Sequence, residues 1–212
     1  MTEHASSLYH VYQEPREGGP PHPGLLLLHG RGANEYDLLG LGEELDPRLF
    51  TVSARAPVEM WGGYHWYMPG EMGRDQAGFE RALGLVQAFV AELPGLHPID
   101  PAKLVVAGFS QGAVLACALT LSRPEHMAAT AMLSGCLPAH RGFAVVEQTI
   151  AGHRIFIGHG TQDPGMRIEM GREARDYLAS AGAAVEYHEY AMGHQVSLDE
   201  MHDLRRWLQG VL

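Results

Sequence analysis

Short apolar runs alternate with longer stretches of helical periodicity along most of this chain, and this alternation constrains the fold more than any other feature. The runs have the length of strands buried on both faces of a parallel sheet. They lie at residues 25–28, 51–54, 104–107, 130–133 and 155–157, and a more polar run at 185–190 is expected nearer a sheet edge.

Between these runs, apolar residues follow helical spacing over residues 79–93, 170–181 and 198–208. Residues 112–121 are apolar nearly all round, which predicts a helix buried against the sheet. Strands alternating with helices predict an α/β chain with a doubly wound, mostly parallel sheet. We expect one domain over residues 1–212, with a strand and loop over 1–24 and no large lid domain, because the chain has no interior linker and its connections are short.

Ligands of open parallel sheets bind beyond the carboxyl ends of the strands, so the loops after the apolar runs are where chemistry is expected. Residues 104–107 run into Gly108-Phe109-Ser110-Gln111-Gly112 and then into the buried helix. Strand, sharp turn and helix are the context of a nucleophile elbow, in which small residues flank a strained serine. The G-x-S-x-G pattern alone is weak and also fits a tight turn with a capping serine. Its context favours Ser110 as a nucleophile.

A nucleophilic serine needs a base, and the base needs a carboxylate that orients it. In an elbow-type hydrolase the chain order is serine, acid, histidine. Asp163 follows the run at 155–157, in the loop where the acid belongs. Asp-Pro-Gly is also good chemistry for an Asx turn before a helix, and the two interpretations are compatible.

Seven histidines follow Ser110, and their places in the pattern separate them. Only His194 lies between the last apolar run and the last helix, because Ser197 and Glu200 form an S-x-x-E capping box that starts that helix. The others lie in a strand, in a helix, at a helix end or ahead of the acid; they are His126, His140, His153, His159, His188 and His202. His194 is the predicted base, although a histidine at this place also fits an ordinary surface loop.

Acyl transfer also requires N–H donors for the developing oxyanion. One is expected from the residue after the nucleophile, Gln111, and the other from the loop after an early strand. Within HGRG at residues 29–32, we predict the N–H of Arg31 as the second donor and a structural role for His29.

Residues 60–68 are rich in aromatic side chains and methionine and follow a predicted strand. A loop packed onto the core and an apolar wall for the substrate are both open interpretations. If they form a wall, its expected members are Trp61, Tyr64 and Trp66, together with Met166 after the acid loop.

Composition excludes several classes of protein. Twenty-five acidic against fifteen basic residues give a net charge of −10, which disfavours a nucleic-acid partner. Two cysteines without a CxxC pair indicate neither a disulfide framework nor a metal site, and favour a reducing, cytoplasmic setting. Residues 1–13 lack the pattern of a signal peptide, and no apolar run is long enough to insert stably in a membrane.

The chain resembles the bacterial phospholipase/carboxylesterase family, which includes the acyl-protein thioesterases. The resemblance rests on LLLLHGRGANEYDLL, RAPVEMWGGYHWY, GFSQGA, LSGCLP, HGTQDP and GHQVS, which appear in the family's order. It implies an α/β-hydrolase fold and a serine hydrolase that needs no cofactor or metal and cleaves small-molecule carboxylic esters or thioesters of small to medium acyl chains. It carries the triad roles onto Ser110, Asp163 and His194, and the oxyanion roles onto Arg31 and Gln111.

Two departures from the family pattern concern the substrate. Arg31 stands where many relatives have a hydrophobic residue, and it could favour an anionic substrate group. Gly165-Met166 stands where many have a pair of valines. A weakly catalytic binding protein on this fold, and a triad used for perhydrolysis or amide cleavage, stay open as alternatives, and the sequence is compatible with a homodimer.

Overall fold

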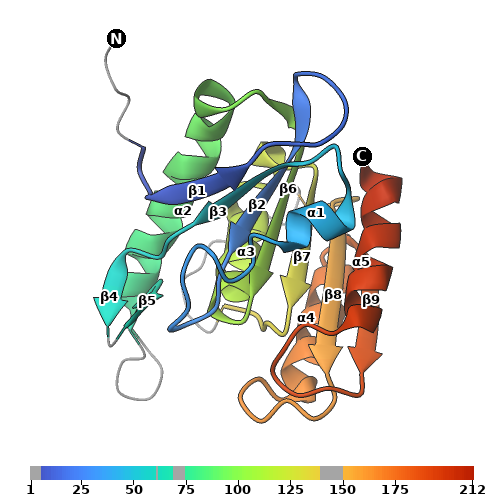
Figure 1. Cartoon of the computed structure of the whole chain (residues 1–212). Coiled ribbons are helices and arrows are strands. Elements are labelled where there is room, and N and C mark those ends of the chain that lie inside the picture. The colour runs from blue at the N-terminus through green and yellow to red at the C-terminus, as the bar shows by residue number, and fades with distance from the viewer. Residues whose placement is uncertain (1–5, 61, 69–74, 139–149) are drawn as a thin grey trace.

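The computed structural model describes residues 6–60, 62–68, 75–138 and 150–212. A seven-stranded sheet in the order β1-β3-β2-β6-β7-β8-β9 runs through it, and every neighbouring pair is parallel except β1 and β3 (Figure 1). Its strands are β1 His10–Gln13, β2 His22–Leu28, β3 Phe50–Ala54, β6 Ile99–Phe109, β7 Ala129–Leu133, β8 Arg154–Gly160 and β9 Ala184–Tyr190.

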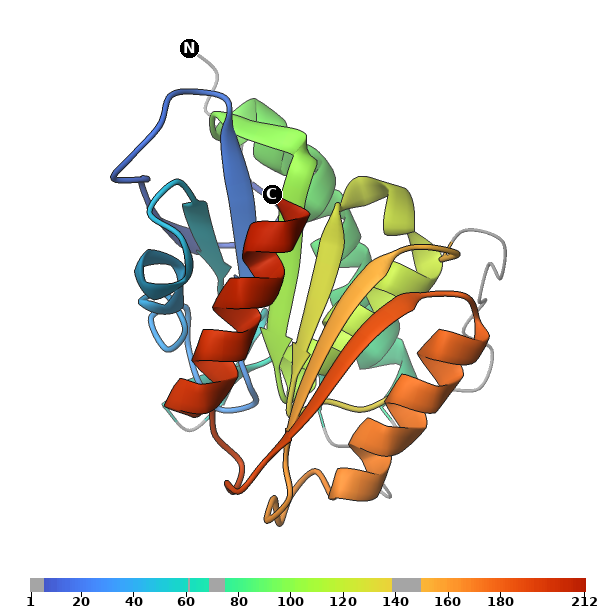
Figure 2. The ribbon, with the colours of Figure 1, turned by 90° about the vertical axis from the view of Figure 1, so that its right-hand side faces the viewer.

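The helices cover both faces of this sheet. They are α1 Leu41–Leu45, α2 Gln76–Leu96, α3 Gln111–Ser122, α4 Ile168–Ser180 and α5 Leu198–Val211, with a short 3-10 turn η2 at Pro124–His126. α2, α3 and α4 pack on one face, and α1 and α5 on the other (Figure 2). The arrangement confirms the predicted doubly wound, mostly parallel sheet, and no lid domain is present in the described ranges.

Alternating side chains of the central strands explain the two cores. Leu26 and Leu28 of β2 join the core under α2 and α3, whereas Leu25 and Leu27 join the core under α1 and α5. Because successive side chains of a strand point to opposite faces, an unbroken apolar run is needed when both faces are covered. β9 lies at the sheet edge, as its more polar sequence predicted.

α3 is buried along almost its whole length, as predicted from its uniformly apolar sequence. It packs against β6 and β7 and contributes residues to both cores on its face of the sheet. Since it begins directly after Ser110, the position of this serine is set by the most deeply buried helix in the described part of the chain.

Two elements were not predicted from the sequence: α1, and a hairpin of β4 Val58–Met60 and β5 Gly63–His65. β1 lies within residues 1–24, where a strand and a loop were expected. The hairpin occupies part of the aromatic stretch and bonds to the loop after β2. Gly32 N–H donates to Tyr64 O and Tyr64 N–H donates to Ala33 O, both at 2.8 Å. Among the described helices, none has the length and apolar character needed to cross a membrane.

Candidate active site

Ser110 lies between β6 and α3 with φ +54° and ψ −116°, a conformation that residues other than glycine seldom adopt. The turn leaves no room beside it. A Cβ on Gly108 would lie 2.3 Å from Gly112 O, and a Cβ on Gly112 would lie 2.0 Å from Leu28 O. Both glycines of the motif are therefore required by space, and the backbone approaches they permit hold Ser110 at the end of the strand.

His194 lies in the loop between β9 and α5 and faces Ser110. Its Nε2 is 2.8 Å from Ser110 Oγ, the distance of a hydrogen bond that the hydroxyl can donate. Its ring packs on Phe109, with ring centroids 4.8 Å apart, and its side chain is 31% exposed. The imidazole is thus held by an apolar neighbour and remains open to small molecules.

Asp163 follows β8 and reaches the other nitrogen of the same ring. His194 Nδ1 lies 2.6 Å from Asp163 Oδ2, while Oδ1 accepts the N–H groups of Gly165 and Met166 at 2.8 Å each. Burial is the largest influence on this carboxyl and opposes ionisation, but the hydrogen bonds from Met166, His194 and Gly165 together outweigh it and lower the pKa of Asp163. A buried, ionised carboxylate fixes the ring with a proton on Nδ1 and a free Nε2.

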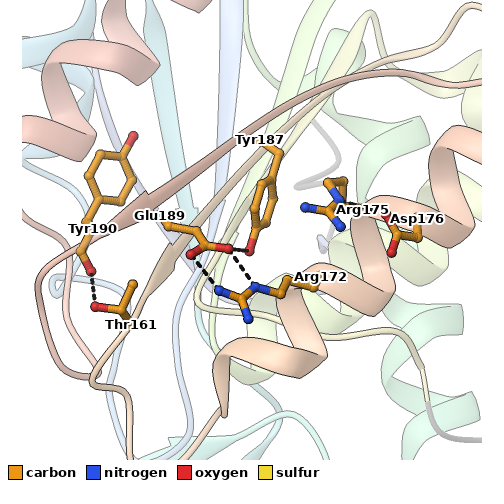
Figure 3. Close-up of polar contacts among 7 residues, drawn as sticks. All are labelled: Thr161, Arg172, Arg175, Asp176, Tyr187, Glu189 and Tyr190. Atoms are coloured by element: carbon orange, nitrogen blue, oxygen red, sulfur yellow. Dashed lines mark hydrogen bonds and ion pairs between the residues drawn. The ribbon is translucent and has the colours of Figure 1, made fainter.

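The loops that carry Asp163 and His194 are bonded to each other at their roots. Thr161 N–H donates to Tyr190 O at 2.8 Å. The Thr161 hydroxyl donates to the same oxygen at 3.1 Å (Figure 3). Gln162 N–H donates to Met192 O at 3.0 Å. These bonds join the ends of two neighbouring strands, so they hold Asp163 and His194 in fixed positions relative to each other.

The two predicted oxyanion donors lie on different elements. Gln111 begins α3, where the first N–H groups of a helix have no partner within it. Arg31 lies in the loop after β2, and its N–H has no acceptor among the described residues. Both N–H groups are therefore available to a bound carbonyl oxygen.

His29 anchors the loop that holds Arg31, in keeping with the structural role expected for it. Its ring is wholly buried, with Nδ1 2.7 Å from Gly30 O and Nε2 accepting the Ala56 N–H at 3.1 Å. Burial lowers the pKa of His29, so the ring is neutral and works as a fixed bridge between two loops.

The side chain of Gln111 has a role that the sequence reasoning missed. Its Oε1 accepts the Trp66 N–H at 2.9 Å and its Nε2 donates to Tyr67 O at 2.8 Å. One side chain thus ties the elbow to the segment after β5. A polar residue at the start of an otherwise apolar, buried helix was the available signal, since a buried amide needs partners.

The residues predicted as a substrate wall lie in different surroundings. Trp66 is 1% exposed, and its indole N–H donates to His29 O at 2.8 Å, so its interpretation as a wall residue is wrong: the ring belongs to the core. Tyr64 and Met166 are partly buried, with Arg55 4.6 Å above the Tyr64 ring. Trp61 lies outside the described residues.

Tyr67 and Cys136 were not predicted as wall residues, yet both pack, like Met166, against the core under α2 and α3. Burial is the main cause that raises the pKa of both side chains, and Cys136 raises the pKa of Tyr67 further. Tyr67 belongs to the segment held by Gln111, and Cys136 lies close enough to influence it.

Comparison with known proteins places this geometry in a family. The model of the phospholipase/carboxylesterase family matches residues 14–212. The chain belongs to the phospholipase/carboxylesterase family. It is 26% identical to acyl-protein thioesterase 1 of Mycosarcoma maydis over 93% of this chain and 95% of that protein. The structure of the Bacillus cereus carboxylesterase superposes with a TM-score of 0.86 at 28% identity, over 97% of this chain and 95% of that one. The crystal structure of esterase PE8 superposes with a TM-score of 0.84 at 28% identity, over 97% and 99%.

Membership confirms the family and the α/β-hydrolase fold that the motifs predicted. It also confirms the expected class of enzyme, since this chain is an ester hydrolase of the phospholipase/carboxylesterase family.

Proposed function

We propose that this enzyme hydrolyses carboxylic esters or thioesters of small to medium acyl chains through an acyl-enzyme on Ser110. The observation that carries the proposal is the unbroken line of contacts from Asp163 through His194 to Ser110, at 2.6 Å and 2.8 Å. Serine acyl transfer requires a base within hydrogen-bond reach of the nucleophile, and an acid within reach of the base to orient it.

In the first half of the reaction, Ser110 Oγ attacks the carbonyl carbon as its proton passes to His194 Nε2. The carbonyl electron pair moves onto oxygen, where the N–H groups of Arg31 and Gln111 bind it; each such donor is worth roughly 3 kcal/mol. Collapse of this intermediate breaks the C–O or C–S bond, and His194 returns its proton to the departing alcohol or thiol.

In the second half, the oxygen of a water molecule attacks the acyl carbon while His194 takes its proton. Collapse releases the carboxylic acid and returns the proton to Ser110. Asp163 keeps the ring in one tautomer and stabilises the imidazolium in both halves. Replacing Ser110 by Ala is expected to lower kcat by a factor on the order of 10⁶.

The acyl length and the leaving group are proposals that rest on the surface around Tyr67, Cys136 and Met166. A series of p-nitrophenyl esters of rising acyl length, with one acyl-CoA thioester, measures both through kcat/KM. A sharp fall after a medium chain supports a pocket closed by this surface. A monotonic rise with chain length contradicts the proposed small to medium acyl preference.

Arg31 also suggests selectivity for an anionic group on the substrate. Its side chain is exposed, has no ion pair among the described residues, and is close enough to lower the pKa of His65 and of Tyr67 electrostatically, in each case as a lesser influence than burial. Replacing Arg31 by Leu keeps the backbone N–H. The variant is expected to raise KM for a carboxylate-bearing ester and leave KM for its neutral methyl analogue unchanged; equal changes for both esters contradict this role.

Other uses of the same site give different assay results. Peroxide-dependent turnover exceeding ester hydrolysis indicates perhydrolysis, and faster turnover of anilides than of the matched esters indicates amide cleavage. A protein that binds esters but shows no turnover, and does not react with a fluorophosphonate, is a binding protein and excludes the proposed mechanism.

We further propose that residues 1–212 act as one domain in the cytoplasm, on a small-molecule substrate and without a nucleic-acid partner. The two cysteines are free, and burial raises the pKa of both thiols. The one-domain proposal is compatible with a homodimer. Analytical ultracentrifugation of the purified protein measures its oligomeric state.

A further inference from the structure

Glu200, the third residue of α5, is a carboxylic acid in an unusual place. Its side chain is 0% exposed, and neither carboxyl oxygen has a hydrogen-bond partner among the described residues. Buried carboxyl groups are normally paired, because an unpaired charge in an apolar interior is very costly. The proposed reaction steps do not use this group.

The capping box expected from Ser197 and Glu200 forms in one direction only. Ser197 Oγ accepts the Glu200 N–H at 3.2 Å and caps α5. In return, the Ser197 N–H approaches the carboxyl closely enough to lower its pKa somewhat, but it does not reach hydrogen-bond geometry. The side chain turns into the protein and contacts the sheet.

The carboxyl lies against Gly158 in β8. A Cβ on Gly158 would lie 2.0 Å from Glu200 Oε1, so glycine is needed at this strand position to admit the carboxyl. Gly158 O accepts the Ser134 N–H at 2.8 Å. Leu133, the residue before Ser134, accepts the Ser110 N–H at its carbonyl oxygen at 2.9 Å. Glu200 therefore contacts the strand that leads to Asp163, one strand away from the support of the elbow.

The same carboxyl is near the root of the histidine loop. It acts electrostatically on Tyr190, the last residue of β9, whose carbonyl accepts both hydrogen bonds from Thr161. Glu200 thus lies near the side chain of Tyr190, the residue whose backbone carbonyl takes part in joining the Asp163 loop to the His194 loop (Figure 3 shows the Thr161–Tyr190 bond).

Nothing around this position is suited to balance a negative charge. β7 and β8 present Leu133, Phe156 and Gly158, and α1 presents Leu45 while its glutamates are exposed. The surrounding elements carry titratable groups at Glu43 and Glu44 on α1, Arg154 and His159 on β8, Glu186, Tyr187, His188, Glu189 and Tyr190 on β9, Asp199, His202, Asp203, Arg205 and Arg206 on α5, and Asp163 and His194 in the two loops. None of these charged groups is among the influences on the pKa of Glu200. His188 is already beside Glu186 and Asp203, at 3.0 Å and 3.5 Å. Burial raises the pKa of Glu200 to about 8.

We propose that Glu200 is a positioning residue whose neutral carboxyl group sets the packing of α5 against β8 and β9, and thereby the distance between Asp163 and His194. This proposal rests on the proposed function of those two residues. When the carboxyl ionises, it draws water or moves away from Gly158, and the roots of both loops shift. Such a shift lowers kcat more than it changes KM, since it affects the reacting groups rather than the substrate wall.

Three variants test the proposal through kcat, KM and thermal unfolding measured from about pH 6 to about pH 9. Glu200→Gln keeps the shape and cannot ionise. Glu200→Ala removes the group, and Asp199→Asn is the matched control, because Asp199 is the exposed neighbour on the same turn. Only pH values at which each variant remains folded are compared.

The proposal predicts that kcat of the wild-type enzyme falls above about pH 8 without unfolding, and that Asp199→Asn behaves likewise. Glu200→Gln should keep kcat within about twofold near pH 7 and lose the alkaline fall, and Glu200→Ala should lose about tenfold in kcat with little change in KM. An alkaline fall retained in Glu200→Gln overturns the proposal, as does a folded Glu200→Ala with wild-type kcat. Ser110→Ala distinguishes a failure of the positioning role of Glu200 from a failure of the proposed function. If that variant stays active, the proposed function itself has failed.

Discussion

Ser110 occupies a left-handed backbone conformation that costs roughly 1–3 kcal/mol for a residue with a side chain. The surrounding structure holds it there, through the Ser110 N–H bond to Leu133 O and through the burial of α3 directly after it. The strain has a use, since it lifts Oγ out of the strand toward His194. At the scale of single residues, the site is therefore a set of rigid contacts imposed by glycines and buried carbonyls.

Asp163→Asn tests the orienting role at this scale. The amide oxygen can still accept the N–H groups of Gly165 and Met166, but an NH₂ group then faces His194 Nδ1 and forces the proton onto Nε2. The wrong tautomer cannot accept the proton of Ser110, so kcat should fall on the order of 10⁴-fold with little loss of thermal stability. A variant that keeps more than about a tenth of wild-type kcat argues against Asp163 as the acid.

The proximity of Ser110, Asp163 and His194 could be predicted from the sequence because each follows a recognisable strand, and parallel strands bring their carboxyl ends to one edge of the sheet. The roles of Gln111 and Trp66 could not. The Gln111 amide binds Trp66 N–H across 45 residues, and the Trp66 indole binds His29 O across 37. The pattern of nearby residues gives no information on partners so distant in the sequence. An aromatic-rich stretch alone does not show which of its rings is buried.

At the scale of elements, the site depends on how the β4–β5 hairpin meets the loop after β2. The two segments exchange backbone hydrogen bonds at 2.8 Å, and a Cβ on Gly63 would lie 2.0 Å from Gly32 O. The hairpin thus presses on the loop that presents the Arg31 N–H. Its short strands were missed in the sequence because glycines interrupt them, whereas the long helices and central strands were predicted within a few residues of their ends.

Gly63→Ala tests this contact. The added methyl group must displace the Gly32 carbonyl, and a shift of about 1 Å in an oxyanion donor can cost on the order of 100-fold in rate. We expect kcat to fall at least tenfold while KM changes less. Gly84→Ala is the control, because this exposed glycine of α2 has open space around it and should be neutral or slightly stabilising. Equal kcat for both variants and wild type would show that the hairpin does not set the oxyanion loop.

At the scale of the whole molecule, the buried carboxyl of Glu200 makes folding depend on pH. In the folded state its pKa is about 8, against an ordinary value of 4.5. Between these values the folded protein holds a proton that the unfolded chain has released. Stability therefore falls as pH rises through this window, by up to about 1.4 kcal/mol per pH unit from this one group.

Glu200→Gln removes this dependence. The free energy of unfolding of the variant minus that of the wild type should grow between about pH 5 and about pH 8, and stay constant below about pH 4.5, where the carboxyl is protonated in both states. Denaturant titrations at several pH values measure it, and one cooperative transition at each pH is expected if residues 1–212 form one domain. A difference independent of pH would mean that Glu200 is already ionised in the folded protein.

The proposed mechanism requires Ser110 to form the acyl-enzyme. Mass spectrometry of the enzyme after reaction with a fluorophosphonate, followed by peptide mapping, tests this step. We expect one adduct, on the peptide that contains Ser110, and neither an adduct nor ester hydrolysis in Ser110→Ala. An adduct on another residue, or a Ser110→Ala variant that hydrolyses p-nitrophenyl esters near the wild-type rate, would contradict it.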